Sequence, residues 1–231
     1  MRYIVPVFYG TLINVLRVIV YTFARVEVVG KENLPRRGAM ILASNHLNNV
    51  DPPVLATALP RRLTFMAKQE MFQWPVVGLI TRLAGAFPVH RSEADLGALH
   101  KASDVLRRGE ILTMFPEGSR SRNGKMRKAH PGTALLALRS EVPILPVAIT
   151  GTETIVLWRL PFDLVRLRRP RLRIVIGHPF FLPPVERATA EEAKRCTDLI
   201  MGHIAALLPP SYRGQYADAA DSDEPVIERT R

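Results

Sequence analysis

The sequence predicts an α/β protein with a central mixed, mostly parallel sheet flanked by helices. Short apolar runs rich in β-branched residues alternate along the chain with longer stretches of helical periodicity, a pattern typical of a sheet covered on both faces. The 231 residues are enough for one substantial core. We therefore expect an apolar membrane-associated helix over residues 1–24, one α/β domain over 25–210 and a flexible acidic tail over 211–231.

The expected elements follow one another with short connections. Apolar runs predict strands at 25–29, 39–44, 63–67, 86–89, 111–115, 144–149 and 171–176. Helical spacing predicts helices at 52–59, 70–83 with a bend at Pro75, 94–108, 131–139 and 190–208. In the last of these, Ile200 and Ile204 share one apolar face. After Pro209 and Pro210 the composition becomes small and acidic, which predicts the loose tail.

The N-terminal segment raises the question of a membrane. Residues 3–24 are largely apolar, and as a helix they would extend about 33 Å, enough to cross a bilayer. Pro6, Gly10, Asn14 and Arg17 interrupt the segment, and an arginine in the middle of a spanning helix costs about 3 kcal/mol or more. No small-residue cleavage site follows, so a signal peptide is a poor fit. We expect a helix that lies in the membrane interface, peripheral or monotopic, with Arg2, Arg17 and Arg25 toward the lipid headgroups. A spanning helix and a buried core helix are the alternatives.

Charge and cysteine content narrow the function classes. The chain carries a formal net charge of +11, and because residues 217–231 sum to −3, the rest carries +14 and should attract phosphates on lipid, nucleotide or nucleic acid. Aromatic residues are few and no groove-reading helix is evident, which disfavours nucleic acid. Cys196 is the only cysteine, so we expect a reducing, cytosolic setting. No metal, P-loop or dinucleotide motif is present, and we expect neither a metal nor a cofactor.

The block from Asn45 to Asp51 follows a predicted strand and contains an imidazole and a carboxylate. The Asp51 carboxylate can hold one ring nitrogen of His46 and leave the other to take a proton from a hydroxyl. No serine or cysteine elbow accompanies the pair, so an external alcohol is the more natural nucleophile. The alternatives are a purely structural histidine and, because Pro52 and Pro53 follow, a helix N-cap at Asp51.

The second block, residues 115–121, also follows a predicted strand. Because the carboxyl ends of parallel strands meet at one edge of a sheet, both blocks should face one crevice. Gly118 would let the backbone approach a ligand, and the guanidinium groups of Arg91 and Arg120 suit phosphate oxygens. A solvated basic loop is the alternative for the cations that follow, Arg122, Lys125, Arg127 and Lys128.

Four blocks together resemble a known family. Asn45-His46 with Asp51, then 85–91, 115–121 and 142–147, are similar in order and spacing to the four motifs of the glycerolipid acyltransferases, and the chain resembles the bacterial 1-acylglycerol-3-phosphate members over about residues 25–155. The resemblance implies an acyl thioester donor, with His46 as general base and Asp51 orienting it. It also implies that the substrate is bound by Asn45, Arg91, Glu117, Gly118, Ser119 and Arg120.

The resemblance therefore predicts acyl transfer from acyl-CoA or acyl carrier protein to the free hydroxyl of 1-acyl-sn-glycerol 3-phosphate, giving phosphatidic acid. The expected partners are this anionic lysolipid, the donor and the cytoplasmic face of the cell membrane, with no nucleic acid. Asn48, where many members have serine, leaves other acceptors open: glycerol 3-phosphate, another lysophospholipid or a glycolipid. A non-catalytic basic protein that binds membranes or nucleic acid is the alternative from another class. Residues 142–147 also read as an ordinary buried strand.

Overall fold

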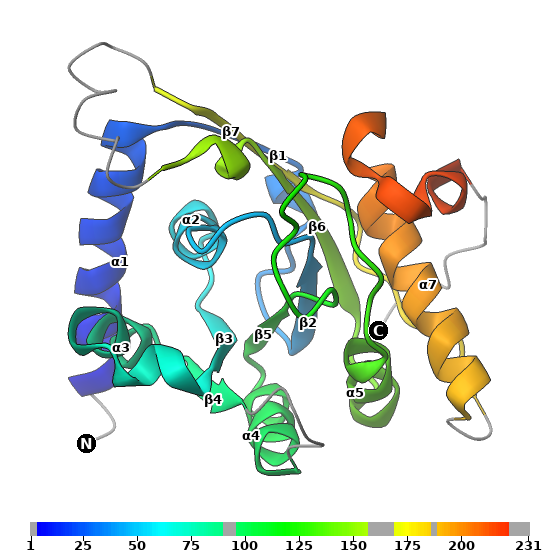
Figure 1. Cartoon of the computed structure of the whole chain (residues 1–231). Helices are drawn as coiled ribbons and strands as arrows, with labels where there is room; N and C mark the ends of the chain where they lie inside the picture. The colour runs from blue at the N-terminus through cyan, green and yellow to red at the C-terminus, as the bar shows by residue number, and fades with distance from the viewer. Residues whose placement is uncertain (1–3, 90–95, 157–168, 186–188, 222–231) are drawn as a thin grey trace.

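The computed structural model describes residues 4–89, 96–156, 169–185 and 189–221, and it has the predicted α/β architecture. One seven-stranded sheet runs in the order β1-β7-β6-β2-β5-β3-β4, and only the β6–β7 pair of these strands is antiparallel (Figure 1). The strands are β1 (Arg25–Val29), β2 (Met40–Ser44), β3 (Leu63–Lys68), β4 (Phe87–Val89), β5 (Ile111–Met114), β6 (Ile144–Thr150) and β7 (Arg171–Ile176).

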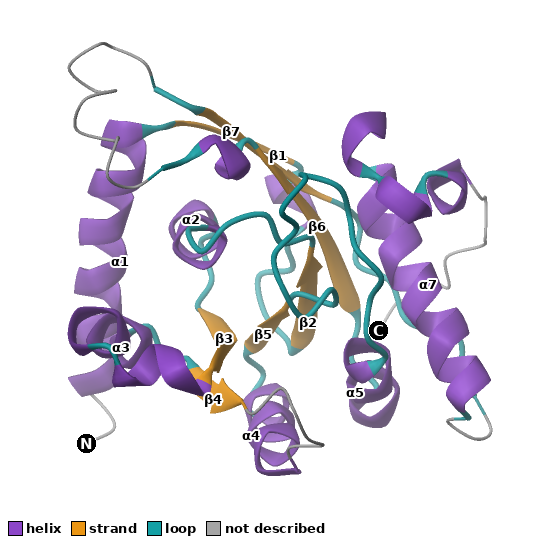
Figure 2. Ribbon diagram, in the orientation of Figure 1, coloured by secondary structure: helices purple, strands orange, loops and turns teal. Residues whose placement is uncertain are grey.

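Helices cover both faces of the sheet (Figure 2). Among the described residues they are α1 (Ile4–Phe23), α2 (Asp51–Ala58), α3 (Pro75–Leu83), α4 (Leu96–Arg107), α5 (Gly132–Ser140) and α7 (Ala190–Ala206). In central strand β2, Ile41 and Ala43 pack with α4, α5 and α7, whereas Met40 and Leu42 pack with α1 and α2. Because side chains alternate along a strand, two layers of helices bury all of β2.

The parallel register brings the two predicted blocks to one edge of the sheet. β2 pairs in parallel with β5, Ala43 beside Met114, and with β6, Ser44 beside Val147. The turn after Ser44 and the loop after Met114 therefore leave the sheet side by side.

α1 packs along the body of the protein. Ile13 is buried against α2, and the Tyr9 hydroxyl accepts a hydrogen bond of 3.2 Å from Leu63 N at the start of β3. Arg17, predicted to face lipid headgroups, donates instead to the Thr57 carbonyl at 3.0 Å. Arg169, which precedes β7, donates to the carbonyls of Tyr21 and Ala24 at the C-terminal end of α1. In the described part of the chain no helix has the length and apolar character needed to span a membrane.

Two predicted segments differ from the structure. Residues 70–83 form not one bent helix but a 3₁₀ turn, η2 (Gln69–Gln73), followed by α3, because Pro75 has no N–H for the preceding turn and begins a new helix. Residues 211–221 are not a loose tail: they form the 3₁₀ turns η5 (Pro210–Tyr212), η6 (Gly214–Tyr216) and η7 (Asp218–Asp221). Tyr216 is buried there, because its ring gives this polar segment a contact with the core beside α7. Residues 222–231 lie outside the described residues.

Candidate active site

His46 and Asp51 form a hydrogen-bonded pair in the turn between β2 and α2, residues 45–51, which we call the histidine turn. His46 Nδ1 lies 2.7 Å from Asp51 Oδ2, and this oxygen also accepts the backbone N–H groups of Leu47 at 2.7 Å and Asn48 at 2.8 Å. A carboxylate can only accept, so Nδ1 carries the proton and Nε2 of the neutral ring keeps its lone pair. Among the described residues Nε2 has no hydrogen-bond partner. This ring nitrogen can therefore accept a hydrogen bond or a proton.

Asp51 does not cap α2, contrary to one reading of the sequence. Val50 holds the N-cap position, Asp51 is the first helical residue, and its carboxylate is directed back into the histidine turn. Pro52 and Pro53 lack N–H groups, so the helix offers fewer donors to a capping side chain than the histidine turn does. The fully buried carboxylate therefore serves the imidazole.

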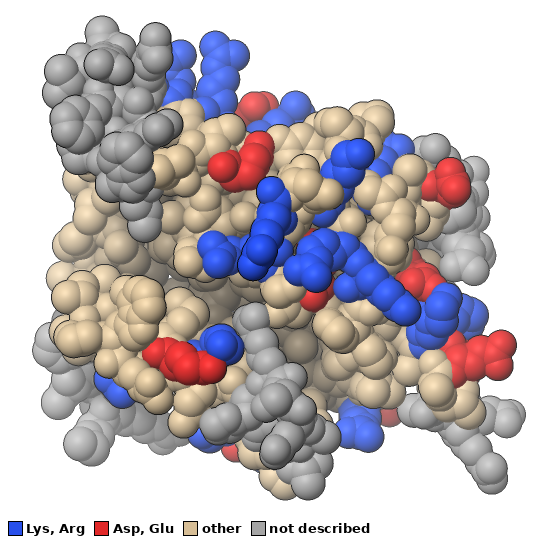
Figure 3. Space-filling model, viewed as in Figure 1, with Lys and Arg blue, Asp and Glu red and all other residues tan. Residues whose placement is uncertain are grey.

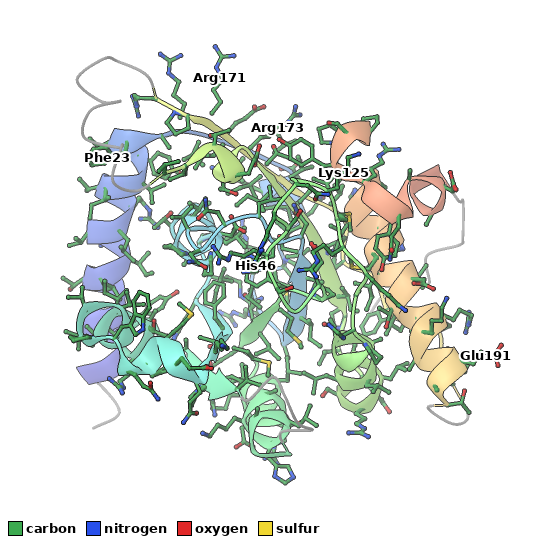
Figure 4. The ribbon with its side chains drawn as sticks, in the orientation of Figure 1. Phe23, His46, Lys125, Arg171, Arg173 and Glu191 are labelled. Carbon is green, nitrogen blue, oxygen red and sulfur yellow. The ribbon has the colours of Figure 1, made fainter. Side chains whose placement is uncertain are left out.

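The loop after β5, residues 117–130, which we call the basic loop, lies against the histidine turn. Ser121 N donates to the His46 carbonyl at 2.8 Å. The Glu117 side chain, 2% exposed, accepts from His46 N at 3.1 Å through Oε1 and from Arg127 N at 2.9 Å through Oε2. The structure thus brings together the two blocks that the sequence predicted would share a crevice, and a buried carboxylate joins their backbones. Figure 4 shows His46 near the centre of the view, between α2 and the strands.

The other predicted residues of the basic loop have distinct surroundings. The Ser119 hydroxyl accepts from Arg127 Nη1 at 2.6 Å, and the Arg120 side chain is exposed. Lys and Arg side chains gather in a band across this face of the molecule (Figure 3). Gly118 has a φ of +67°, and a Cβ there would lie 2.9 Å from His130 Cδ2, so His130 occupies space that we expected a ligand to use. Arg91 lies outside the described residues.

Asn45 pairs with the sheet. Its Nδ2 donates to the Ile149 carbonyl at 2.9 Å, and its Oδ1 accepts from Ile149 N at 2.8 Å. The side chain, 1% exposed, thereby continues the β2–β6 pairing by one step beyond Ser44. This contact fixes the first residue of the histidine turn.

Two neighbours of the pair were not predicted. The Phe115 ring stacks on the His46 ring, with centroids 4.1 Å apart and planes at 19°. Asn48 Nδ2 donates to the carbonyls of Thr152 at 2.9 Å and Ile155 at 3.1 Å, around the 3₁₀ turn η3 (Thr152–Thr154). The residues that Asn48 contacts are more than a hundred positions away, so no local pattern in the sequence could have indicated these bonds. Within the described ranges no three His, Cys, Asp or Glu side chains converge as a metal site requires.

Comparison with known proteins agrees with this geometry. A sequence model of the Acyltransferase family matches residues 25–150, more than half of the chain. The chain belongs to the acyltransferase family. It is 29% identical over 184 residues to the 1-acyl-sn-glycerol-3-phosphate acyltransferase of Bacillus subtilis, covering 77% of this chain and 87% of that protein. The protein of the same name from Borreliella burgdorferi is 28% identical over 60% of this chain, which spans 56% of that relative.

A solved structure resembles this acyltransferase. The crystal structure of the 1-acyl-sn-glycerophosphate (LPA) acyltransferase PlsC from Thermotoga maritima superposes with a TM-score of 0.62 and 25% sequence identity. The match covers 85% of this chain and 76% of that chain.

Burial controls the charge of the carboxyl that joins the two halves of the acyltransferase site. Removal from water raises the pKa of Glu117 to about 7, while hydrogen bonds from the Arg127 and His46 backbone and the charge of Arg127 act in the opposite direction. The charge of nearby Asp51 adds slightly to the rise. Glu117 therefore exchanges a proton near neutral pH.

This raised pKa predicts a pH-dependent stability. Between about pH 4.5 and 7 the folded protein keeps a proton on Glu117 that the unfolded chain releases, so this group's contribution to the free energy of unfolding falls as the pH rises. Glutamine releases no proton. Urea unfolding followed by circular dichroism measures the free energy of unfolding of each protein. The value for Glu117→Gln should rise relative to that of wild type across this pH window and level off above it. A difference that does not change with pH would contradict the assignment.

Proposed function

We propose that this acyltransferase transfers an acyl group from acyl-CoA or acyl carrier protein to the free hydroxyl of 1-acyl-sn-glycerol 3-phosphate, giving phosphatidic acid. The observation that carries the proposal is the buried His46–Asp51 pair with Nε2 unengaged, beside a loop rich in exposed cations. The printed names of the relatives support the same acceptor. A binding protein without chemistry would not require a carboxylate that fixes one imidazole tautomer.

The reaction follows from the proton positions. Asp51 holds His46 by Nδ1–H, so Nε2 accepts the proton of the acceptor hydroxyl as its oxygen attacks the thioester carbonyl. The imidazolium that forms is stabilised by the Asp51 carboxylate. When the tetrahedral intermediate collapses, the carbon–sulfur bond breaks and the departing thiolate takes the proton from Nε2. The products are the new ester and the free thiol, and His46 is neutral again.

The basic loop would hold the acceptor's phosphate. Arg120 is exposed and adjacent to Ser121, whose N–H binds the His46 carbonyl, and we assign its guanidinium to the phosphate of a ligand that contacts the imidazole. We assign Arg91 the same role. Ser119 would act by orienting Arg127. Both oxygens of Glu117 hold backbone N–H groups, and we propose that Glu117 and Asn45 shape the site rather than contact the phosphate.

Substitution of the pair tests the base. His46→Ala should lower kcat by about 10²- to 10⁴-fold, because the proton then has no acceptor. Asp51→Asn keeps an oxygen for the Leu47 and Asn48 N–H groups but loses the charge that stabilises the imidazolium, so we expect a severe loss there too. Both should be measured as thiol release from palmitoyl-CoA, with circular dichroism to verify folding. A folded His46→Ala protein with near-normal turnover would exclude this mechanism.

Arg120→Ala tests whether this side chain binds the acceptor's phosphate. We expect the KM for lysophosphatidic acid to rise about tenfold or more with kcat little changed, since the cation binds the phosphate equally in ground and transition states. Lys194→Ala, which removes an exposed cation on α7, is the control and should leave KM as in wild type. An unchanged KM in Arg120→Ala would show that other residues bind the phosphate.

An exposed apolar face would dock on the membrane that carries the acceptor. Val18 of α1 is 68% exposed, and Trp74 and Val76 at the start of α3 are 65% and 70% exposed. The two helices contact one another on one side of the molecule (Figure 1). Tryptophan and aliphatic side chains on neighbouring helices suit the interface between lipid headgroups and acyl chains. We propose peripheral binding through this face, on the cytoplasmic side, because a chain with one cysteine forms no intramolecular disulfide and suits a reducing compartment.

Charged substitutions test this docking face. The double variant Val18→Asp, Val76→Asp should lower the binding of vesicles of phosphatidylglycerol and phosphatidylethanolamine about tenfold or more, because each carboxylate would have to enter the interface. The double variant Ala190→Asp, Ala206→Asp, at two exposed positions of α7, is the charge-matched control. Sedimentation with vesicles measures the bound fraction. Equal binding of wild type and the double variant would exclude this face.

One assay addresses the reaction and the acceptor together. Thiol release from palmitoyl-CoA should be measured with lysophosphatidic acid, glycerol 3-phosphate, another lysophospholipid and a glycolipid, for wild type and His46→Ala side by side. We expect release that depends on lysophosphatidic acid in the wild type alone. A preference for another acceptor would keep the mechanism and change the substrate, whereas no release with any acceptor would exclude the proposal.

A further inference from the structure

Residues 209–216, which we call the C-terminal strap, connect α7 to the active-site side of the molecule. The strap contains η5 and η6 and lies outside the region that matches the family model. In Figure 1 this orange-red segment begins at the end of α7 and runs beside the green loop that precedes α5. The buried side chains Ile200 and Ile204 fix α7 to the sheet, so the strap starts from a rigid element.

The strap is bonded to the middle of the basic loop. The Tyr212 carbonyl accepts from Met126 N at 2.8 Å, and the Tyr216 hydroxyl accepts from Ala129 N at 3.0 Å. Gly214 has a φ of +56°, and a Cβ there would lie 2.4 Å from the Met126 carbonyl oxygen, which shows how closely the two backbones approach. Met126 and Tyr216 are each 5% exposed. The contact is therefore a packed one.

The strap also reaches the segment behind the histidine turn. The Tyr212 hydroxyl donates to Glu153 Oε1 at 2.5 Å, and Glu153 belongs to η3. The preceding carbonyl, of Thr152, accepts from Asn48 of the histidine turn. Burial, and then the hydrogen bond to Glu153, raise the pKa of Tyr212 to about 12, so its hydroxyl stays protonated and keeps donating at neutral pH.

The basic loop is thus held from two sides. On the inner side, Glu117 binds Arg127 N and His46 N. On the outer side, the strap binds the amides on either side of Arg127, at Met126 and Ala129. A 14-residue loop without such ties would lose conformational freedom when it closed on a phosphate, and that loss would weaken binding.

We propose that Tyr212 and Tyr216 are positioning residues, which hold the basic loop against the histidine turn and so preorganise it for the acceptor's phosphate. This inference rests on the proposed function, because it assigns the basic loop to acceptor binding. The two tyrosines contact no reacting atom, and they act through Met126, Ala129 and Glu153.

Tyr216→Phe is the direct test, because it keeps the buried ring and removes only the acceptor for Ala129 N. We expect the KM for lysophosphatidic acid to rise about five- to tenfold, the effect of losing one buried hydrogen bond, with kcat changed less than about twofold. Tyr212→Phe, which leaves Glu153 Oε1 without its donor, should raise KM in the same direction. Ser211→Ala, an exposed strap position, is the matched control and should behave as wild type.

Hydrogen exchange of the substrate-free protein separates this inference from the proposed function. In Tyr216→Phe the amides of residues 119–130 should exchange faster than in wild type, while those of α4 should not. If the wild type transferred no acyl group but this local change were present, the proposed function would be wrong and the contact between strap and loop would stand. The effect of that contact on phosphate binding would then be measured by calorimetry with glycerol 3-phosphate. An unchanged KM or binding constant in Tyr216→Phe, or a lowered melting temperature with exchange raised evenly across the protein, would overturn the proposal.

Discussion

Asp51 Oδ2 accepts three hydrogen bonds inside the protein, from the His46 ring and from two backbone N–H groups of the histidine turn. A fully buried carboxylate is costly unless it has hydrogen-bond partners, and here the turn supplies three to Oδ2, whereas Oδ1 has none among the described residues. The same three bonds shape the turn, orient the imidazole and set its tautomer. The chemistry that we propose depends on this one oxygen. Without it the imidazole would have no fixed orientation, and the proton could lie on either ring nitrogen.

The parallel sheet provides the second constraint. β2, β5 and β6 end at one edge, so the histidine turn, the basic loop and η3 leave the core as neighbours. Backbone register alone would leave these loops free to move. Side chains with more than one polar atom join them: Asn45 to β6, Glu117 to His46, and Asn48 to η3. The C-terminal strap closes the arrangement from outside through Tyr212 and Tyr216. The candidate active site is therefore held together by amide, carboxyl and phenol groups.

Several features of this site could be predicted from the sequence because they are local or periodic. His46 and Asp51 are five positions apart in one turn, and the strand before them is an unbroken apolar run. The fold class followed from alternating apolar runs and helical stretches, and the structure confirms the mixed, mostly parallel sheet. The errors concern segments whose partners are distant. Arg17 was expected at a headgroup and binds Thr57, and residues 211–221 were expected to be loose because their composition is polar and small.

The sequence by itself determined the fold class, the family resemblance, and the imidazole and carboxylate pair, since each depends on spacing that the chain carries locally. Only the tertiary structure decided which polar groups hold the loops together. The resemblance predicted Glu117 as a substrate ligand, and only the structure showed that its two oxygens accept from backbone N–H groups 10 and 71 positions away. Tyr212 and Tyr216 carry no local signal at all, because the groups they contact are 59 and 87 positions away along the chain. Hydrogen bonds of this kind arise from how the elements pack, which no stretch of sequence specifies alone.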